Sequence, residues 1–270
     1  MNKLRFKYFV RQVQPYLPNP LFLLSVNLEL KLRRLPDRIR FDKENQLYSI
    51  FNGSDFFYFP RKKRVLLYSK GLDTRLAKLE KNYFLDSVVL HDNDYFVDCG
   101  ANVGEVSMAV SRRSQCKILV VEPEDLEFKC LKLNLPVDRT SFYHGVLSDI
   151  DGYVNFYSVP NSADSSIIQP RPNLKPSSSK SWRLDSIFTT IKFDGRIGLK
   201  LEAEGAEPEV LRGSTQILER ISCVTFDASP ERGISQTSTQ EEVIEILEKQ
   251  KFVIKEFIPG RFILFCKETI

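Results

Sequence analysis

Length, composition and charge already restrict the class of protein. The chain has 270 residues, of which 42% are hydrophobic and 27% charged, and its net charge is +4. This ordinary globular composition excludes extended disorder and suffices for one large α/β domain with an accessory segment. The five cysteines show no Cys-x-x-Cys spacing and there are only two histidines. We therefore expect no zinc site, and reduced thiols in a cytoplasmic protein.

Charge is distributed unevenly along the chain. Residues 1–81 hold 18 Lys and Arg against 7 Asp and Glu, a net of +11, whereas residues 82–270 carry a net of −7. We favour an accessory segment that docks on the acidic remainder; the alternative is a surface for an anionic partner such as a phosphorylated glycan carrier or a membrane leaflet. Polar residues interrupt the signal-like start, and the apolar run Leu21–Val26 is far shorter than the ~20 residues of a membrane-spanning helix. We expect neither secretion nor a transmembrane segment, with peripheral membrane association as the alternative.

Residues 1–93 are expected to form a basic N-terminal accessory or cap region ahead of a core domain over residues 94–270. The predicted elements of this region are a helical stretch to Leu35 with proline interruptions, short strands over residues 41–68 with turns at Asn52-Gly53 and Pro60-Arg61, and an amphipathic helix over residues 72–86.

From residue 94 onward, short apolar runs rich in Val, Ile and Phe alternate with amphipathic stretches, which is typical of βαβ units in a mainly parallel sheet. The expected strands are 95–98, 117–122, 141–147, 152–159, 196–202 and 223–227, and the expected helices are 103–113, a segment ending at Leu133, 207–218 and 239–249. Two last strands, 252–258 and 262–267, flank the tight turn Pro259-Gly260-Arg261. We predict the methyltransferase version of the Rossmann-like fold (class I), whose seven-stranded, mainly parallel sheet ends in an antiparallel hairpin.

Residues 160–181 are rich in Ser, Pro and Asn and predict a loop between two strand-forming regions. Long loops in compact domains often act as lids or substrate loops; a tolerated insertion is the alternative.

The segment Asp98-Cys-Gly-Ala-Asn-Val-Gly104 joins the first core strand to its helix, at the sheet edge where α/β folds bind ligands. Gly100 permits a sharp turn against the ligand, and Gly104 permits close packing of the helix on the strand. A nicotinamide site usually has glycine where this chain has Asn102, so a pyrophosphate is disfavoured. S-adenosylmethionine has no phosphate, and its amino-acid tail and sulfonium cation suit Asp98 and backbone groups. The loop therefore predicts an S-adenosylmethionine site.

Two further carboxylates follow on successive strands. Glu122 ends the second strand, where a carboxylate accepts both ribose hydroxyls. Asp149 follows the third strand and is expected to meet the adenine edge. The predicted cofactor-binding residues are Asp98, Gly100, Asn102, Gly104, Glu122 and Asp149.

With these pieces in place, the sequence resembles the FkbM-type methyltransferase family. The resemblance rests on Asp98–Gly104, Val121-Glu122-Pro123, Leu184-Asp185 and above all residues 199–213, Leu-Lys-Leu-Glu-Ala-Glu-Gly-Ala-Glu-Pro-Glu-Val-Leu-Arg-Gly. It extends from about residue 58 to the end, and residues 1–57 match nothing. It implies methyl transfer from S-adenosylmethionine to a hydroxyl oxygen, often on sugars or other natural products, with cofactor contacts at all the residues above except Gly104. The family's usual Lys-x-Asp-x-Glu-Gly reads Lys200-Leu-Glu-Ala-Glu-Gly205 here, so Glu202 is one methylene longer than the usual Asp.

Methyl transfer to an alcohol requires removal of its proton, because a hydroxyl group is a poor nucleophile. In this fold the carboxyl ends of the fourth and fifth strands face the methyl group and carry Glu202, Glu204 and Asp227, with His144 on the third strand. Our order for the catalytic base is Glu204, then Glu202, then His144. The alternatives are that Glu204 caps the following helix, that His144 is an ordinary strand residue, and that the three acids hold one Mg²⁺.

We expect an O-methyltransferase that acts on a glycan or glycan-like hydroxyl. The alternatives are methylation of a polyketide or other small natural product, and a non-catalytic scaffold built on the cofactor fold. The fourth strand lacks the Asn/Asp-Pro-Pro-Tyr/Phe motif that holds the amino group of a flipped base. We therefore expect neither nucleic-acid N-methylation nor specific nucleic-acid binding.

Overall fold

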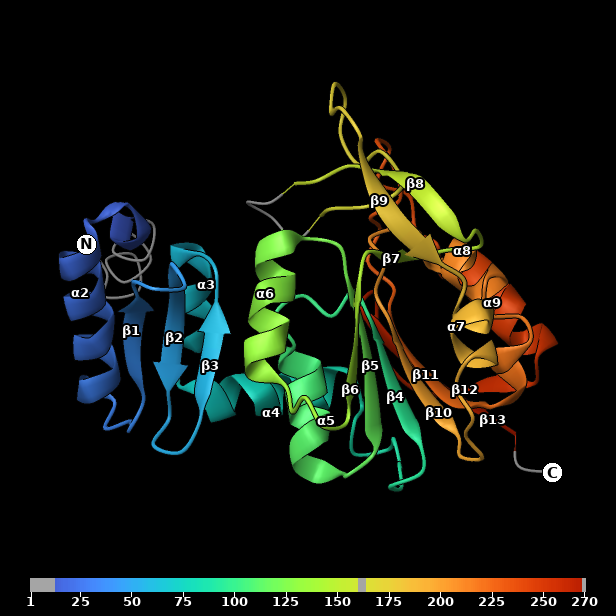
Figure 1. Cartoon of the computed structure of the whole chain (residues 1–270), viewed down its shortest axis with the longest axis horizontal. Helices are drawn as coiled ribbons and strands as arrows, with labels where there is room; N and C mark the ends of the chain where they lie inside the picture. Colours follow the sequence, from blue (N-terminus) through green and yellow to red (C-terminus); the bar gives the residue numbers. More distant parts are fainter. Residues whose placement is uncertain (1–12, 160–163, 269–270) are drawn as a thin grey trace.

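A seven-stranded sheet forms the centre of the structure, a computed structural model that describes residues 13–159 and 164–268. Its strands are, in chain order, β4 (Tyr95–Cys99), β5 (Lys117–Glu122), β6 (Thr140–His144), β10 (Ile197–Leu201), β11 (Ile221–Asp227), β12 (Phe252–Ile258) and β13 (Phe262–Lys267). They lie in the order β12-β13-β11-β10-β4-β5-β6 (Figure 1). β4 pairs in parallel with β5 and β10, whereas β13 runs antiparallel to β11 and β12. The predicted class I Rossmann-like fold, with its hairpin ending, is confirmed.

Helices cover both faces of this sheet. One face carries α4 (Leu72–Asn82), α5 (Glu105–Arg113) and α6 (Asp125–Asn134); the other carries α7 (Leu184–Thr189), α8 (Glu207–Arg212) and α9 (Gln240–Lys249) (Figure 1). Successive side chains of a strand point to opposite faces, so Phe96 and Val97 of β4 enter different apolar clusters. Because both faces are covered, the central strands are apolar almost throughout.

The third predicted strand is wrong in its second half. The strand is interrupted at Gly145, where any Cβ would overlap the carbonyl oxygen of Lys180. Beyond the break, β7 (Val146–Leu147) leaves the central sheet and joins β9 (Ser177–Trp182) and β8 (Gly152–Phe156) in a second sheet. The end of the loop predicted over residues 160–181 is therefore a strand. Its serines did not indicate a strand, but backbone pairing to β7 and β8 stabilises it. Residues 160–163 of that loop lie outside the described residues.

The helix predicted over residues 207–218 is also too long. α8 ends at Arg212, and a separate 3-10 turn, η3, spans Ile217–Glu219. The interruption falls at Gly213, whose backbone lies so close to the carbonyl oxygen of Ser148 that no side chain fits between them.

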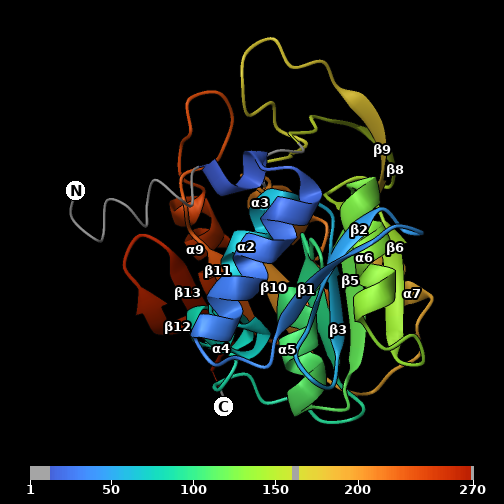
Figure 2. The same cartoon turned by 90° about the vertical axis from the view of Figure 1, so that its left-hand side faces the viewer.

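The N-terminal region is a small α/β unit. Its elements are η1 (Gln14–Tyr16), α2 (Asn19–Leu32), β1 (Arg38–Asp42), β2 (Leu47–Phe51), β3 (Phe56–Phe59), α3 (Lys62–Val65) and η2 (Leu66–Tyr68), followed by α4. The three strands form an antiparallel sheet, and α2 lies across its outer side (Figure 2). The short strands predicted over residues 41–68 are confirmed up to residue 59, but residues 62–68 are helical. Among the described residues, no helix is both long and apolar enough to cross a bilayer.

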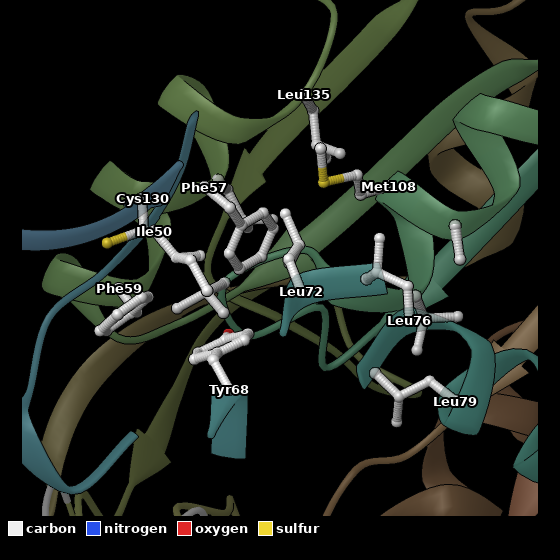
Figure 3. Packing of buried hydrophobic residues seen from close by; sticks show 14 of the residues in the cluster. Ile50, Phe57, Phe59, Tyr68, Leu72, Leu76, Leu79, Met108, Cys130 and Leu135 are labelled. Atoms are coloured by element: carbon white, nitrogen blue, oxygen red, sulfur yellow. The ribbon is translucent and has the colours of Figure 1, made fainter. Parts of the chain in front are cut away.

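The N-terminal region and the core domain share one apolar cluster. Figure 3 shows Phe57, Tyr68 and Leu72 in the same cluster as Met108 of α5 and Leu135 beyond α6. The Phe57 and Tyr68 rings lie 5.9 Å apart between centroids. The region therefore docks on the core domain through apolar side chains and also through ion pairs of the kind that the charge distribution suggested, Arg61–Glu127, Arg64–Glu105 and Arg75–Glu105.

Candidate functional site

A cavity of about 290 Å³ lies at the carboxyl edge of β4, β5 and β10, close to the lower end of the ~300–1,000 Å³ typical of small-ligand pockets. Its walls come from the segments after these three strands, from β7, from residues 165–167, and from the N-terminal region around α3 and α4. Parallel strands bring their carboxyl ends to one edge, so segments about 100 residues apart meet there.

The loop after β4 supplies the tightest turn of the site. Gly100 and Asn102 both line the cavity and have positive φ angles of +71° and +52°. A Cβ on Gly100 would overlap the carbonyl oxygen of Glu202, so only glycine fits. Gly104 does not line the cavity; with a φ of +86° it packs against Leu131 of α6. Two of the three predicted loop residues thus face the cavity, and the third holds the loop from behind.

We expect Gly100→Ala to unfold more readily than the wild type and to lose cofactor binding. An alanine in the left-handed region costs about 1–2 kcal/mol, and the overlap with Glu202 adds about 1–3 kcal/mol. Gly260→Ala is the matched control, because Gly260 has a similar φ of +68° but no atom within 4 Å of the added Cβ. Urea denaturation of both variants measures the difference; equal losses of stability would show that the contact with Glu202 does not matter.

Glu122 lies where β5 ends and lines the cavity. Its Oε2 accepts the backbone N–H of Asn102 at 2.8 Å, and its Oε1 accepts that of Glu124 at 2.9 Å. Burial raises the pKa of Glu122 to about 8 in spite of these two donors. Each carboxylate oxygen has a second lone pair, so the geometry fits a ligand that offers two hydroxyl groups.

Asp98 is fully buried and does not line the cavity. Its Oδ2 accepts the Ser107 hydroxyl at 2.6 Å, and its Oδ1 lies 3.1 Å from Nζ of Lys200. Lys200 also lies 2.7 Å from Oε2 of Glu202 and donates to the carbonyl oxygen of Gly100 at 2.7 Å. Asp98 was predicted to contact the cofactor directly, but Lys200 lies between Asp98 and the cavity.

Glu202 faces the cavity but is already engaged. Besides Lys200, Tyr83 donates its hydroxyl to Oε2 of Glu202 at 2.7 Å. Burial favours the neutral acid, but Lys200 and Tyr83 outweigh it, and the pKa of Glu202 is lowered. A carboxylate that has a lowered pKa and already binds two partners is a weak proton acceptor. Glu202 therefore fits a structural role better than that of the catalytic base.

Glu204 lies on the cavity wall with an unusual left-handed φ of +51°. Burial and the neighbouring Glu202 and Glu231 raise its pKa well above the ordinary range. Burial also raises the pKa of Glu231. Arg232 fixes the loop that carries Glu231 through a 2.8 Å ion pair with Glu209. Two neighbouring carboxyl groups that both resist ionisation influence each other's titration.

His144 and Asp149 lie outside the cavity wall. The His144 ring stacks on Phe128 at 4.4 Å between centroids, and its Nε2 lies 3.2 Å from Oδ1 of Asp125. Asp149 is exposed to solvent. The interruption at Gly145 explains both placements, because it directs β7 to the cavity and leaves His144 and Asp149 outside it.

Asp227, named above as a Mg²⁺ ligand, pairs with Arg261 at 2.9 Å and accepts the Ser229 hydroxyl at 2.6 Å. It does not join Glu202 and Glu204. Across residues 13–159 and 164–268, no three His, Cys, Asp or Glu side chains converge in a way that could hold a metal ion.

Sequence reasoning missed the contribution of the N-terminal region to the site. Arg75, Leu79 and Tyr83 line the cavity from α4 and its end, and their spacing of four residues, which places them on one helix face, was the available signal. Arg64 joins them from α3, and Glu231 lies in a loop without a motif; neither had a signal in the sequence.

The chain matches the methyltransferase FkbM domain over residues 98–254, more than half of its length. It belongs to the FkbM methyltransferase family. The predicted family is thereby confirmed, and the protein is an S-adenosylmethionine-dependent methyltransferase. The matched range contains the loop after β4, Glu122, Lys200, Glu204 and Glu231, but neither Arg64 nor α4.

Comparison with solved structures finds several methyltransferases at low identity. The precorrin-6y C5,15-methyltransferase of Geobacter metallireducens is 12% identical, covering 74% of this chain and 89% of that one, with a TM-score of 0.41. A putative rRNA methylase of Clostridium thermocellum is 12% identical, with coverage of 70% and 97% and a TM-score of 0.42. The ribosomal protein L11 methylase of Lactobacillus delbrueckii subsp. bulgaricus is 14% identical, with coverage of 72% and 78% and a TM-score of 0.39. No curated protein matches the sequence.

The residues at the cavity of this FkbM methyltransferase fit the usual methyl donor of the family. Gly100 and Asn102 carry the backbone along the cavity, Glu122 presents a carboxyl group suited to a diol, and the ionised Glu202 provides an anionic group for a cation. The cavity therefore has the chemistry that a nucleoside with a sulfonium group and an amino-acid tail requires.

Proposed function

We propose that this FkbM methyltransferase transfers a methyl group from S-adenosylmethionine to a hydroxyl oxygen of a glycan or glycan-like acceptor. The observation that carries this proposal is Glu204, a cavity-wall carboxyl with a strongly raised pKa. Once ionised, a carboxylate with a raised pKa is a stronger proton acceptor for a poor nucleophile than an ordinary one. An alcohol needs such a group, whereas a thiol or an amine needs it less.

In the proposed reaction, the chain's own residues position the reactants and accept one proton. S-adenosylmethionine supplies a methyl group on a positively charged sulfur, which leaves as the neutral thioether. Gly100 and Asn102 hold the tail side of the cofactor, and Glu122 accepts its ribose hydroxyls. As the carbon–oxygen bond forms and the carbon–sulfur bond breaks, the acceptor's hydroxyl proton passes to the Glu204 carboxylate. Asp98, Gly104 and Lys200 support this arrangement from behind the cavity wall.

Mass spectrometry provides the direct test of the acceptor class. Extracted glycans incubated with the enzyme and S-adenosylmethionine should gain the mass of one CH₂ group for each hydroxyl hydrogen that a methyl group replaces. A gain only on polyketides or other small natural products would favour the second acceptor class. A wild-type protein that fails to bind S-adenosylmethionine in calorimetry would leave the non-catalytic scaffold as the better description.

The rate of methyl transfer should rise with pH on the alkaline side. Glu204 acts as a base only when ionised, and burial together with Glu202 and Glu231 raises its pKa, so the active fraction grows as pH increases. Glu231→Gln removes one like charge and should move this rise to lower pH. Glu241→Gln, at the exposed start of α9, is the control and should leave the profile unchanged. A pH–rate profile identical in all three proteins would contradict the coupling between Glu204 and Glu231.

We also propose that the enzyme works in the cytoplasm, with peripheral membrane contact as the alternative. All five cysteines are free and four of them are buried, which supports a reducing compartment.

A further inference from the structure

We propose that Arg64 and Arg75 bind the carboxylate of the methionine tail of S-adenosylmethionine, so that the N-terminal region completes the cofactor site. This inference rests on the proposed use of S-adenosylmethionine and adds residues that lie outside the matched family domain. It gives the N-terminal region a function beyond packing.

The two arginines meet at one buried carboxylate, that of Glu105. Arg75 donates from Nε and Nη2 at 2.8 and 3.0 Å, and Arg64 donates from Nη2 at 3.0 Å. The hydroxyl of Tyr68 donates to the same carboxylate at 2.8 Å. Burial opposes ionisation of Glu105, but these partners outweigh it, and its pKa is lowered. The cluster is therefore fixed in position and ionised at neutral pH.

The charges in this cluster do not balance. Two guanidinium groups face one carboxylate, since Glu127 is neutralised by its own contact with Arg61. Arg64 is largely buried, and its Nε has no hydrogen-bond partner among the described residues. Both Arg64 and Arg75 line the cavity, so an anion bound there would balance the excess positive charge. The cluster is thus short of one anionic group.

Its position matches the tail of the donor. Glu105 follows directly on the loop after β4 and begins α5, and Arg64, Arg75 and Glu105 all line the cavity. At the other end of the same face of α4, Tyr83 bonds to Glu202. Eight residues of helix separate Arg75 from Tyr83, about 12 Å along the axis. The cavity therefore has a cationic end at Arg75 and an anionic group, Glu202, at the other end, which suits a ligand that is anionic at its tail and cationic at its methyl group.

A pair of probes isolates the carboxylate. S-adenosylmethionine and decarboxylated S-adenosylmethionine share the adenosine, the sulfonium and the ammonium group, and only the first has the carboxylate. By calorimetry without an acceptor, we expect the wild type to bind the decarboxylated compound about 10- to 100-fold more weakly, the range for charge-assisted hydrogen bonds. Equal affinity of the two compounds for the wild type would overturn the proposal without any variant.

Arg64→Met and Arg75→Met then locate the contact. Each substitution should lower the affinity for S-adenosylmethionine about 10- to 100-fold and should change the affinity for the decarboxylated compound less than about threefold. Arg64→Met leaves Glu105 with Arg75 and Tyr68 as partners, so this variant retains a neutralised carboxylate. Arg112→Met is the control; Arg112 pairs with Asp55 and Asp73 at the surface, and both probes should bind this variant as they bind the wild type.

Three results would contradict this assignment. Equal weakening of both probes would mean that the arginines maintain the fold or contact another part of the donor. Unchanged affinity for both, with a raised KM for the acceptor, would assign the arginines to an anionic acceptor. A wild type that binds neither probe would refute the proposed function itself, which distinguishes that failure from the failure of the arginine assignment.

Discussion

Replacing Glu204 by glutamine should lower kcat by about 10²- to 10⁴-fold, the usual loss when a general base is removed. Glutamine keeps the size and the hydrogen-bonding capacity of Glu204 but cannot accept the acceptor's proton. Affinity for S-adenosylhomocysteine should change little, because the residues proposed to hold the cofactor are others. Steady-state kinetics with calorimetry on the same preparation separates the two effects.

Glu202→Gln is the matched control for this experiment. Glu202 also faces the cavity, but Lys200 and Tyr83 already bind its carboxylate, so we expect a smaller loss of kcat together with a loss of stability. A near-wild-type rate for Glu204→Gln would refute Glu204 as the base. A large loss of kcat in Glu202→Gln alone would indicate that Glu202 is the catalytic base, the role for which the sequence analysis ranked it second.

Lys200→Met should destabilise the protein by about 3–5 kcal/mol, the usual cost of leaving a buried charge unpaired. Burial opposes the positive charge of Lys200, but Asp98 and Glu202 outweigh it and raise the pKa of the amine. Methionine fills a similar volume but leaves Asp98, which is fully buried, without its cation. The carbonyl oxygen of Gly100 also loses its donor, so the cofactor loop should loosen.

Lys249→Met is the control for this variant. Lys249 pairs with Glu245 one helical turn away, with both side chains largely exposed, and such exposed pairs contribute little to stability. Chemical denaturation of the two variants should therefore differ several-fold in the free energy lost. If Lys200→Met unfolds at the same denaturant concentration as Lys249→Met, the buried ion pairs contribute nothing to the fold.

The sequence by itself determined the order of the core elements, because that order depends on local periodicity. β12 and β13 have the predicted bounds, since the turn Pro259-Gly260-Arg261 separates two apolar runs. The loop at Gly100 and Asn102 and the carboxylate of Glu122 were also readable, because a tight turn and an acid at a strand end leave local traces. The family resemblance rests in part on the loop and on Glu122, and above all on residues 199–213.

The tertiary structure alone decided which charged groups face the cavity. Lys200 lies opposite Asp98 across the parallel pair β10 and β4, so Asp98 is neutralised inside the wall, and no local pattern links residues 102 positions apart. The break at Gly145 depends on contact with Lys180 of β9, and it removed His144 and Asp149 from the site.

The same physical reason applies to the contribution of the N-terminal region. Arg64 and Arg75 reach the cavity because an apolar cluster fixes α3 and α4 against α5, and Glu231 reaches Glu204 because Arg232 holds its loop. Packing and ion pairing act between surfaces that meet only after folding. Sequence periodicity therefore predicts the sheet and its loops, whereas the charge distribution of the site emerges from contacts between distant segments.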